Sequence, residues 1–457
     1  MSGTPALVSS DLAAGVREVL REQVSRAVQA AAPLRLGRVS SVVGLSVEVA
    51  GLGAAVGETV LIGDPAGPRT AAEVVAVDDG RLRCLPLGHP VGLRSGAPVV
   101  ATGEVTTVPV GRALLGRVVD AFGNPLDGLG PLAGAGRGAL HAAPPPALSR
   151  QRVDTPLGLG VRALDTLVPA GRGQRFGIFA GSGVGKSSLL SMIARGTSAD
   201  VSVLALVGER GREVREFLED DLGAEGLARS VVVVATSDEA PMLRLRAAMT
   251  ATAVSESFRD LGADVVLMLD SLTRVAMAQR EIGLSVGEPP ATRGYPPSVF
   301  ALLPRLLERA GPGVRGSITG IYTVLVDGDD HNDPISDAAR SILDGHVVLD
   351  RKLATAGHFP TIDVLESVSR VAGRVTSREQ RASSTALRRV LAAHRDAKEL
   401  IEVGAYTPGA NADVDAAVAA LPAINAFLRQ DIEEITPAEH AWAMLAHLTA
   451  SFGGAGQ

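Results

Sequence analysis

Residues 177–190 read Gly-Ile-Phe-Ala-Gly-Ser-Gly-Val-Gly-Lys-Ser-Ser-Leu-Leu, and this stretch is the most informative feature of the sequence. The segment before it, 175–179, can form a short buried strand, and the apolar segment 189–194 is compatible with a helix. A strand, a glycine-rich loop and a helix in this order are typical of a phosphate-binding P-loop. The stretch therefore predicts an α/β nucleotide-binding domain.

The residue types of this loop suit the binding of phosphate. Its glycines let backbone N–H groups turn toward one anion, and the following helix adds its positive end. Lys186 supplies a charge for the β- and γ-phosphates, and the Ser187 hydroxyl can ligate Mg²⁺. The residues predicted to contact the nucleotide are Gly181, Ser182, Gly183, Val184, Gly185, Lys186, Ser187 and Ser188.

One residue departs from the strict motif, which places a glycine where this chain has Ala180. A tight turn between a strand and a helix is the structural alternative. Such a turn gives a lysine and a serine after three glycines no packing role, so we favour the P-loop.

Length and composition narrow the class of protein. A chain of 457 residues is too long for one ordinary core, so we expect two or three domains. The net charge of -6 argues against a domain-wide contact with nucleic acid, and the single cysteine, Cys84, excludes a disulfide framework. There is no signal-peptide pattern and no apolar run of about 18 residues, which predicts a cytoplasmic protein.

The N-terminal segment 1–30 has helical periodicity over 9–30, with one apolar face and one charged face. Two interpretations remain open. The helix either lies on its own domain or, because it precedes a separate domain, docks on a partner.

The rest of the chain changes character at several points. Segment 31–110 contains short valine-rich runs punctuated by Gly, Pro and Asp, which predicts a small β-barrel. Segment 111–150 is rich in glycine and proline, and we interpret it as a connector. Between 151 and 377, strand-like and helical segments alternate, which predicts a mainly parallel sheet covered by helices. Segment 378–457 predicts a small helical domain.

Two acidic residues extend the P-loop toward hydrolysis. The apolar run 265–269 ends in Asp270, as in a Walker B strand, where a carboxylate supports Mg²⁺. Strand 201–207 is followed by Gly-Glu-Arg-Gly-Arg-Glu, which places Glu209 at the edge of the sheet where ligands bind. A carboxylate there can polarise an attacking water. The alternative is a charged loop in solvent.

These segments together resemble one family, the flagellar-type protein export ATPases, which are related to the catalytic subunits of rotary ATP synthases. The resemblance runs from about residue 35 to 435, and position 180 is compatible with it. Its specific segments are Pro-Val-Gly-Arg-Ala-Leu-Leu-Gly-Arg-Val-Val-Asp at 109–120, the loop segment 173–187, Gly-Glu-Arg-Gly-Arg-Glu-Val-Arg-Glu-Phe at 208–217, Asp-Ser-Leu-Thr-Arg at 270–274, Gly-Glu-Pro-Pro-Ala-Thr-Arg-Gly-Tyr-Pro-Pro-Ser-Val-Phe at 287–300 and Ser-Ile-Leu-Asp-Gly-His-Val-Val-Leu at 341–349.

The resemblance implies a multidomain fold, with an N-terminal β-barrel, a RecA-like P-loop domain and a C-terminal helical domain. It also implies roles for individual residues: Lys186 and Ser187 for phosphate and Mg²⁺, Glu209 as the catalytic carboxylate, Glu213 near the metal waters, Asp270 as the Walker B aspartate, Arg274 as a γ-phosphate contact, Arg370 as an arginine finger given to a neighbouring subunit, and Phe359 as a stacking partner of adenine.

The resemblance further implies a homohexamer that hydrolyses Mg-ATP to release chaperones and load export substrates. Its partners would be an accessory dimer at the N-terminal helix, a central stalk protein facing the loop 287–298, and a membrane export gate. Segments 324–335 and 353–360 favour a flagellar role over a virulence-type injectisome. The rival functions are a rotary ATP synthase subunit, a nucleotide-binding scaffold without catalysis, and an RNA translocase.

Overall fold

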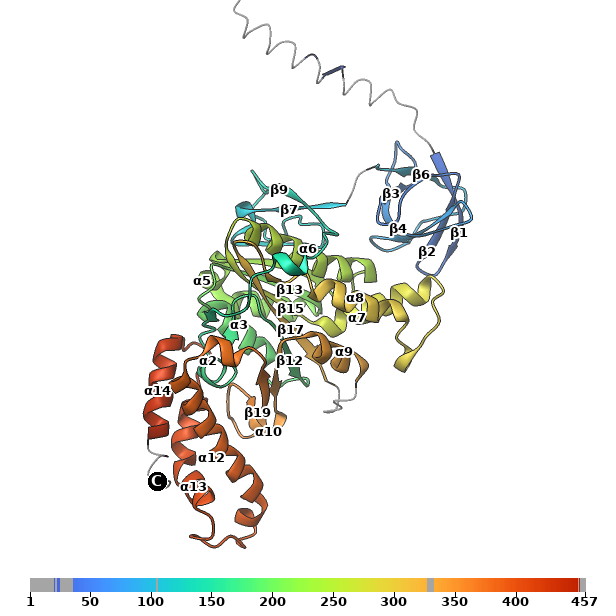
Figure 1. Ribbon diagram of the computed structural model, residues 1–457. Helices are drawn as coiled ribbons and strands as arrows, with labels where there is room; N and C mark the ends of the chain where they lie inside the picture. The colour runs from blue at the N-terminus through green and yellow to red at the C-terminus, as the bar shows by residue number, and fades with distance from the viewer. Residues whose placement is uncertain are drawn as a thin grey trace, which may run out of the picture.

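The structure is a computed structural model that describes residues 20, 23–24, 36–103, 106–326, 333–450 and 452. The chain forms a β-barrel at one end, a central α/β domain, and a helical domain at the other end (Figure 1). The helix predicted over 9–30 lies outside the described residues except at positions 20 and 23–24.

Six antiparallel strands close into a barrel, which confirms the predicted β-barrel, and their order is β1-β2-β5-β4-β3-β6. Their bounds are Leu36–Val43 (β1), Ser46–Ala50 (β2), Thr59–Ile62 (β3), Thr70–Asp78 (β4), Arg81–Pro86 (β5) and Pro98–Ala101 (β6). Alternate residues fill the barrel, and Val47, Val49 and Cys84 are fully buried there. Burial raises the pKa of the Cys84 thiol to about 12, so Cys84 acts as a small apolar core residue.

The central domain is built on a sheet with the strand order β19-β18-β12-β17-β15-β13-β14-β8, and β16 pairs with β17 off this path. All pairs are parallel except β18–β19 and β16–β17. The bounds are Arg117–Val119 (β8), Arg175–Ala180 (β12), Val201–Glu209 (β13), Ser230–Thr236 (β14), Asp264–Asp270 (β15), Gly311–Pro312 (β16), Ser317–Leu325 (β17), Gly345–Leu349 (β18) and Ile362–Ser369 (β19).

Successive residues of the central strands face two different cores, so the sheet is covered on both sides. In β13, Leu204 and Leu206 belong to one core, and Val203, Ala205 and Val207 belong to the other. The helical elements of this domain are Arg162–Leu167 (α2), Lys186–Gly196 (α3), Gly211–Glu216 (α4), the π-helix Phe217–Leu222 (η3), Gly223–Ala228 (α5), Pro241–Asp260 (α6), Leu272–Ser285 (α7), Thr292–Gly294 (η4), Pro297–Leu307 (α8), Pro334–Ile342 (α9), Arg351–Thr355 (α10) and Ala372–Val375 (α11).

The prediction that 111–150 is a connector is wrong, because this segment belongs to the central domain. It contains β8, which pairs in parallel with β14 at the edge of the main sheet. It also contains β9 (Gly136–Ala139), which pairs with β7 (Thr107–Val110) in a two-stranded ribbon. The segment 111–150 is rich in glycine and proline, and β8 has only three residues. Because β8 is stabilised by its pairing with a neighbouring strand, its own residues give little local signal.

Three helices form the C-terminal domain, α12 (Arg378–Glu402), α13 (Ala412–Leu428) and α14 (Ala438–Ala450), which confirms the predicted helical domain. A capping box at Ser377 and Gln380 starts α12, and Asn411 caps α13. None of the helices in the described part of the chain combines the length and apolar character needed to cross a membrane.

The barrel meets the central domain through a small apolar cluster formed by Leu85, Leu87, Met242 and Ile282, and a buried ion pair also joins the two domains. Glu73 of β4 is 8% exposed, and its carboxylate lies 3.8 Å from Nη1 of Arg246 on α6. The ring of His141 lies 3.9 Å from the same carboxylate. Burial raises the pKa of Glu73 to about 7, although the positive charge of Arg246 opposes the rise.

Replacing Glu73 with glutamine tests this junction. The folded protein keeps a proton on Glu73 that the unfolded chain, with its pKa near 4.5, releases. Glu73 therefore contributes its full stability below pH 4.5, and this contribution is lost as pH rises toward 7. We expect Glu73→Gln to resemble wild type near pH 5 and to raise the free energy of unfolding by about 3 kcal/mol at pH 8. Denaturant titrations at both pH values measure the difference, and an equal gain at both would contradict the assignment.

Candidate active site

The site lies at the edge of the sheet where the parallel strands end. The P-loop follows β12, Glu209 ends β13 and Asp270 ends β15. The register pairs Leu206 with Asp270 across β13 and β15, so the two acidic residues come from adjacent strand ends. Parallel pairing therefore brings together side chains that are far apart in the sequence.

The backbone of the P-loop needs glycine at two positions. Gly183 and Gly185 have φ values of 73° and 87°, in the left-handed region that side chains disfavour. Gly185 directly precedes α3, so the free N–H groups of this helix begin at the loop. Ala180, by contrast, is the last residue of β12, and its methyl group is buried in the core. The position is an ordinary strand end, so glycine is not required there.

Lys186 links the loop to both carboxylates. Its Nζ donates to Asp270 Oδ1 at 2.5 Å and to Glu209 Oε1 at 3.1 Å, and Thr323 Oγ1 donates to the same Asp270 oxygen at 2.6 Å. Burial disfavours the charged ammonium, but the two carboxylates outweigh it and raise the lysine pKa. The lysine is therefore a fixed positive charge beside the loop.

Two pockets that share Ser187, Glu209 and Glu213 in their linings surround these groups. The larger, of about 520 Å³, is lined by the loop residues together with Glu209, Glu213 and Arg274. The smaller, of about 140 Å³, brings Ser187 together with Glu209, Glu213 and Asp270. Val184 is the one predicted loop residue turned away, because its carbonyl accepts from Thr361 and its side chain is buried.

The smaller pocket fits Mg²⁺ in its donor chemistry. A hydroxyl and a few carboxylates are the protein ligands that Mg²⁺ takes when phosphates and waters complete its shell. Among the described residues no group of three or more acidic, histidine or cysteine side chains is arranged to hold a metal by itself. Ser187, Asp270 and Glu213 are thus suited to a metal that arrives with a nucleotide.

Arg274 is held beside the phosphate pocket by its packing. It lies in the first turn of α7, where its backbone N–H donates to the capping Ser271 hydroxyl at 3.3 Å. Gly208, at φ 72°, lies under it, and a Cβ there would approach the Arg274 side chain to 3.0 Å. The Arg274 Nε is buried without a hydrogen-bond partner among the described residues. The arginine therefore keeps donor capacity next to the pocket.

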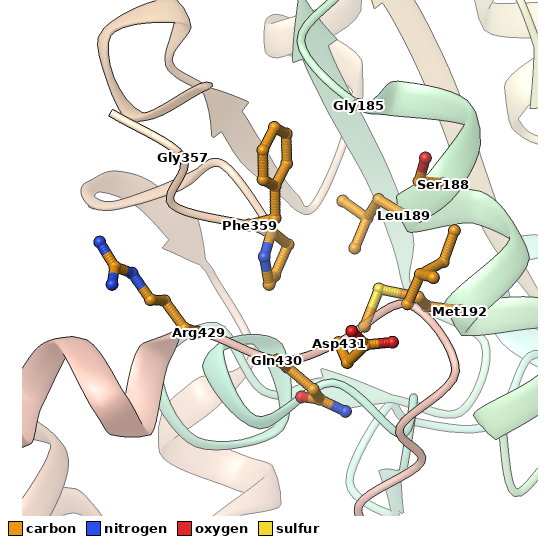
Figure 2. Close-up of a pocket in the computed structure, with 11 residues that line it drawn as sticks. Gly185, Ser188, Leu189, Met192, Gly357, Phe359, Arg429, Gln430 and Asp431 are labelled. Atoms are coloured by element: carbon orange, nitrogen blue, oxygen red, sulfur yellow. The ribbon is translucent and has the colours of Figure 1, made fainter. Parts of the chain in front are cut away.

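Phe359 lies in a separate pocket of about 510 Å³ next to the P-loop helix (Figure 2). Phe359 is 47% exposed and its ring lies near Gly185, while Ser188, Leu189 and Met192 line the facing wall. One face of an aromatic ring is thus accessible for stacking with a flat ligand.

The far wall of this pocket comes from the segment 429–432, which sequence reasoning missed. This segment is irregular and belongs to the C-terminal domain, so it carries no motif. Gln430 fixes it, since its backbone N–H donates to the Phe359 carbonyl at 2.9 Å and its side chain to the Gly160 carbonyl at 2.8 Å. Arg351, which lies over Gly181, was also missed.

Arg370 is the one predicted site residue that the structure does not bring to this edge. It follows β19, which runs antiparallel to β18, so Ile362 is level with Leu349 near the P-loop and Ser369 is level with Gly345. The backbone N–H of Arg370 donates to the Asp344 carbonyl, and the Asp344 N–H donates to Arg175 at the start of β12. Arg370 therefore lies at the edge opposite its own P-loop, exposed to solvent.

Comparison with known proteins gives matches over all three parts of the fold. The family profiles that match are the ATP synthase alpha/beta family nucleotide-binding domain over residues 160–369, the beta-barrel domain of the same family over 39–103, and the T3SS EscN ATPase C-terminal domain over 376–447.

Individual relatives match along most of their length. The flagellum-specific ATP synthase of Bacillus subtilis is 49% identical over 419 residues, which cover 91% of this chain and 96% of that protein. The type 3 secretion system ATPase of Xanthomonas euvesicatoria is 47% identical over 91% of this chain and 94% of that protein. A solved structure, the assembled ATPase EscN with its central stalk EscO from the enteropathogenic E. coli type III secretion system, has a TM-score of 0.84 at 43% identity and covers 90% of this chain and 100% of that chain.

Substitutions at Phe359 test whether its pocket binds the adenine base of the nucleotide. Phe359→Ala removes the stacking face, and we expect KM for ATP to rise about tenfold, since loss of base stacking costs roughly 1–3 kcal/mol. Phe359→Tyr keeps the ring and should leave KM near wild type. Steady-state hydrolysis with ATP and with a triphosphate that lacks the base measures the effect. If both substrates weaken equally, the ring does not contact the base.

Proposed function

The chain belongs to the family of flagellum-specific and type III secretion ATPases, within the ATP synthase alpha/beta family, and on this premise we propose that its ATP hydrolysis drives a flagellar protein export apparatus. The observation that carries the proposed hydrolysis is the meeting of Lys186, Glu209 and Asp270 at one sheet edge, beside a P-loop, and the relatives named for flagellar and type 3 secretion systems support the export role. A scaffold that only binds nucleotide needs no carboxylate at the position of Glu209.

In this proposal the chain's own groups divide the chemistry between them. The loop N–H groups and Lys186 bind and orient the phosphates, and Glu209 accepts a hydrogen bond from the attacking water and polarises it. Arg274 donates to the γ-phosphate from its packed position on α7. Ser187, Asp270 and Glu213 would hold Mg²⁺, which would supply positive charge to offset the charge that develops on the phosphates.

The position of Arg370 supports a ring of six identical chains. Strand β12 has six residues, which at about 3.3 Å each puts Arg370 roughly 17 Å or more from the P-loop of its own chain. An exposed guanidinium at that edge is available to a neighbouring subunit, where it would stabilise the charge of the transferring phosphoryl group. EscN forms an assembly, and this relative supports a homohexamer for the present chain.

The loop 287–298 suits a contact with a central stalk. Its turn is stiffened by the guanidinium of Arg280, which lies 5.3 Å from the centre of the Tyr295 ring, and by the Ser298 N–H, which donates to Glu288. The Arg83 side chain of the barrel donates to the Val286 carbonyl just before it. EscN binds the stalk EscO, which supports a stalk protein as a partner here.

The remaining partners follow from the family. We propose that the segment 1–30 docks on an accessory dimer, that export chaperones and their substrates are the cargo, and that the protein works in the cytoplasm at the membrane export gate. A flagellar role is favoured over an injectisome role by segments 324–335 and 353–360. Relatives named for both systems match at similar identity.

Substitution of Glu209 and Lys186 tests the proposed hydrolysis. Glu209→Gln keeps the size and hydrogen bonding of the side chain but loses the charge that polarises water. We expect turnover of Mg-ATP to fall about a hundredfold or more while nucleotide binding stays near wild type. Lys186→Ala should instead weaken nucleotide binding itself. Phosphate release and the binding of a fluorescent nucleotide separate the two effects.

Glu213→Gln is the variant to compare, because Glu213 lines the same pocket but is assigned to the metal, so it should lose activity mainly at low Mg²⁺. Weak ATP binding with unchanged turnover in Glu209→Gln would contradict the role given to Glu209. Turnover that RNA stimulates would favour a translocase instead.

A further inference from the structure

Arg370 is held in place by contacts to its backbone and to its side chain. Its N–H donates to the Asp344 carbonyl at 3.0 Å. Its Nη2 donates to the Arg340 carbonyl in the last turn of α9 at 3.1 Å. The residue before it, Ser369, donates to the Pro169 carbonyl and accepts from Gln174 Nε2. The direction of this exposed arginine therefore depends on the short segment that contains Asp344.

Asp344 is itself fixed by the first residue of the P-loop strand. Its carboxylate accepts from the Arg175 backbone N–H at 3.2 Å, from Arg175 Nε at 3.0 Å and from Arg175 Nη2 at 3.3 Å. Gln174 Nε2 donates to the Asp344 carbonyl at 3.0 Å. One carboxylate thus ties the loop before β18 to the start of β12 through three donors of one residue.

Arg175 is well suited to this task. Burial disfavours its charge, but the hydrogen bonds and charges of Asp344 and Glu308 outweigh burial and raise its pKa, so it remains a cation. Glu308 contacts Arg175 Nη1 and also accepts from Arg150 Nη1 at 3.0 Å. The result is an alternating chain of charges, Arg150–Glu308–Arg175–Asp344, that ends at the backbone of Arg370.

The next residue along the chain allows this close packing. A Cβ at Gly345 would lie 2.6 Å from the Val368 carbonyl and 3.2 Å from Gln174 Nε2. Only glycine therefore lets β18 and β19 approach closely enough for the Asp344 carbonyl to reach the Arg370 N–H.

We infer that Asp344 and Arg175 are positioning residues that set the direction of Arg370 toward the site of a neighbouring subunit. The inference rests on the proposed role of Arg370 and adds the residues through which that role is achieved. Arg175 is the first residue of β12, and the P-loop follows the other end of this strand. One strand therefore contacts the chain's own phosphate site at one end and, through Asp344, the backbone of Arg370 at the other. A displacement of about 1 Å at a charged group that contacts the transition state can cost on the order of a hundredfold in rate.

A double-mutant cycle on the assembled full-length protein tests this inference. Asp344→Ala removes the acceptor of Arg175, and we expect kcat to fall tenfold to a hundredfold while KM for Mg-ATP stays near wild type, since the chain's own P-loop is intact. In a chain that already carries Arg370→Ala, the same Asp344→Ala change should leave kcat unaltered, because the residue it positions is gone.

Asp127→Ala is the matched control, because Asp127 also accepts from Nε and Nη2 of one arginine, Arg117, far from the site. It should leave kcat unchanged. If Asp344→Ala fails to fold, Arg175→Lys takes its place in the same double-mutant cycle. This substitution keeps the positive charge but loses the forked geometry of the guanidinium.

The outcomes separate the inference from the proposal on which it rests. An equal loss of kcat with and without Arg370 would overturn the positioning role and leave a merely structural one. Wild-type kcat in Asp344→Ala together with slow turnover in Arg370→Ala would overturn the positioning role alone. Wild-type turnover in Arg370→Ala would overturn both.

Discussion

The parallel pairing of β12 with β17 and β18 is the constraint on which the site depends. It directs the P-loop to the sheet edge where β13 and β15 end, so Lys186 meets the carboxylates of Glu209 and Asp270. The reversal of direction at β19 sends Arg370 to the other edge. The P-loop and Arg370 thus lie at opposite edges of the sheet, so the proposed role of Arg370 in phosphoryl transfer requires a second chain.

The pocket around Phe359 depends on the contact between the central domain and the C-terminal domain. The segment 429–432 of the C-terminal domain closes the pocket around Phe359, and Gln430 bonds to the Phe359 carbonyl. Arg162 holds the same segment, since its Nε donates to the Phe427 carbonyl and its N–H donates to Gln430 Oε1. The pocket around Phe359 and the placement of the helical domain therefore share contacts, and the helical domain lies at the end of the molecule opposite the barrel (Figure 1).

The sequence predicts the parts of the structure that carry local signals. The barrel strands are short valine-rich runs between turn residues, and the P-loop strand is a short apolar run. The glycines before Lys186 are explained by a phosphate-binding loop. Strand β8 and the segment 429–432 were missed, because their order comes from β14 and from Arg162 rather than from their own residues. The placement of Arg370 opposite its own P-loop required the direction of β19, which periodicity does not encode.

Mixing two inactive variants tests most directly whether the site is shared between chains. Glu209→Gln lacks the carboxylate and Arg370→Ala lacks the finger, so each should be nearly inactive alone. Mixed rings contain interfaces where an intact Glu209 faces an intact Arg370, and we expect turnover to return when subunits exchange. If proven subunit exchange restores no turnover, and rings doped with a small fraction of either variant lose activity only in linear proportion, a site divided between two chains is contradicted.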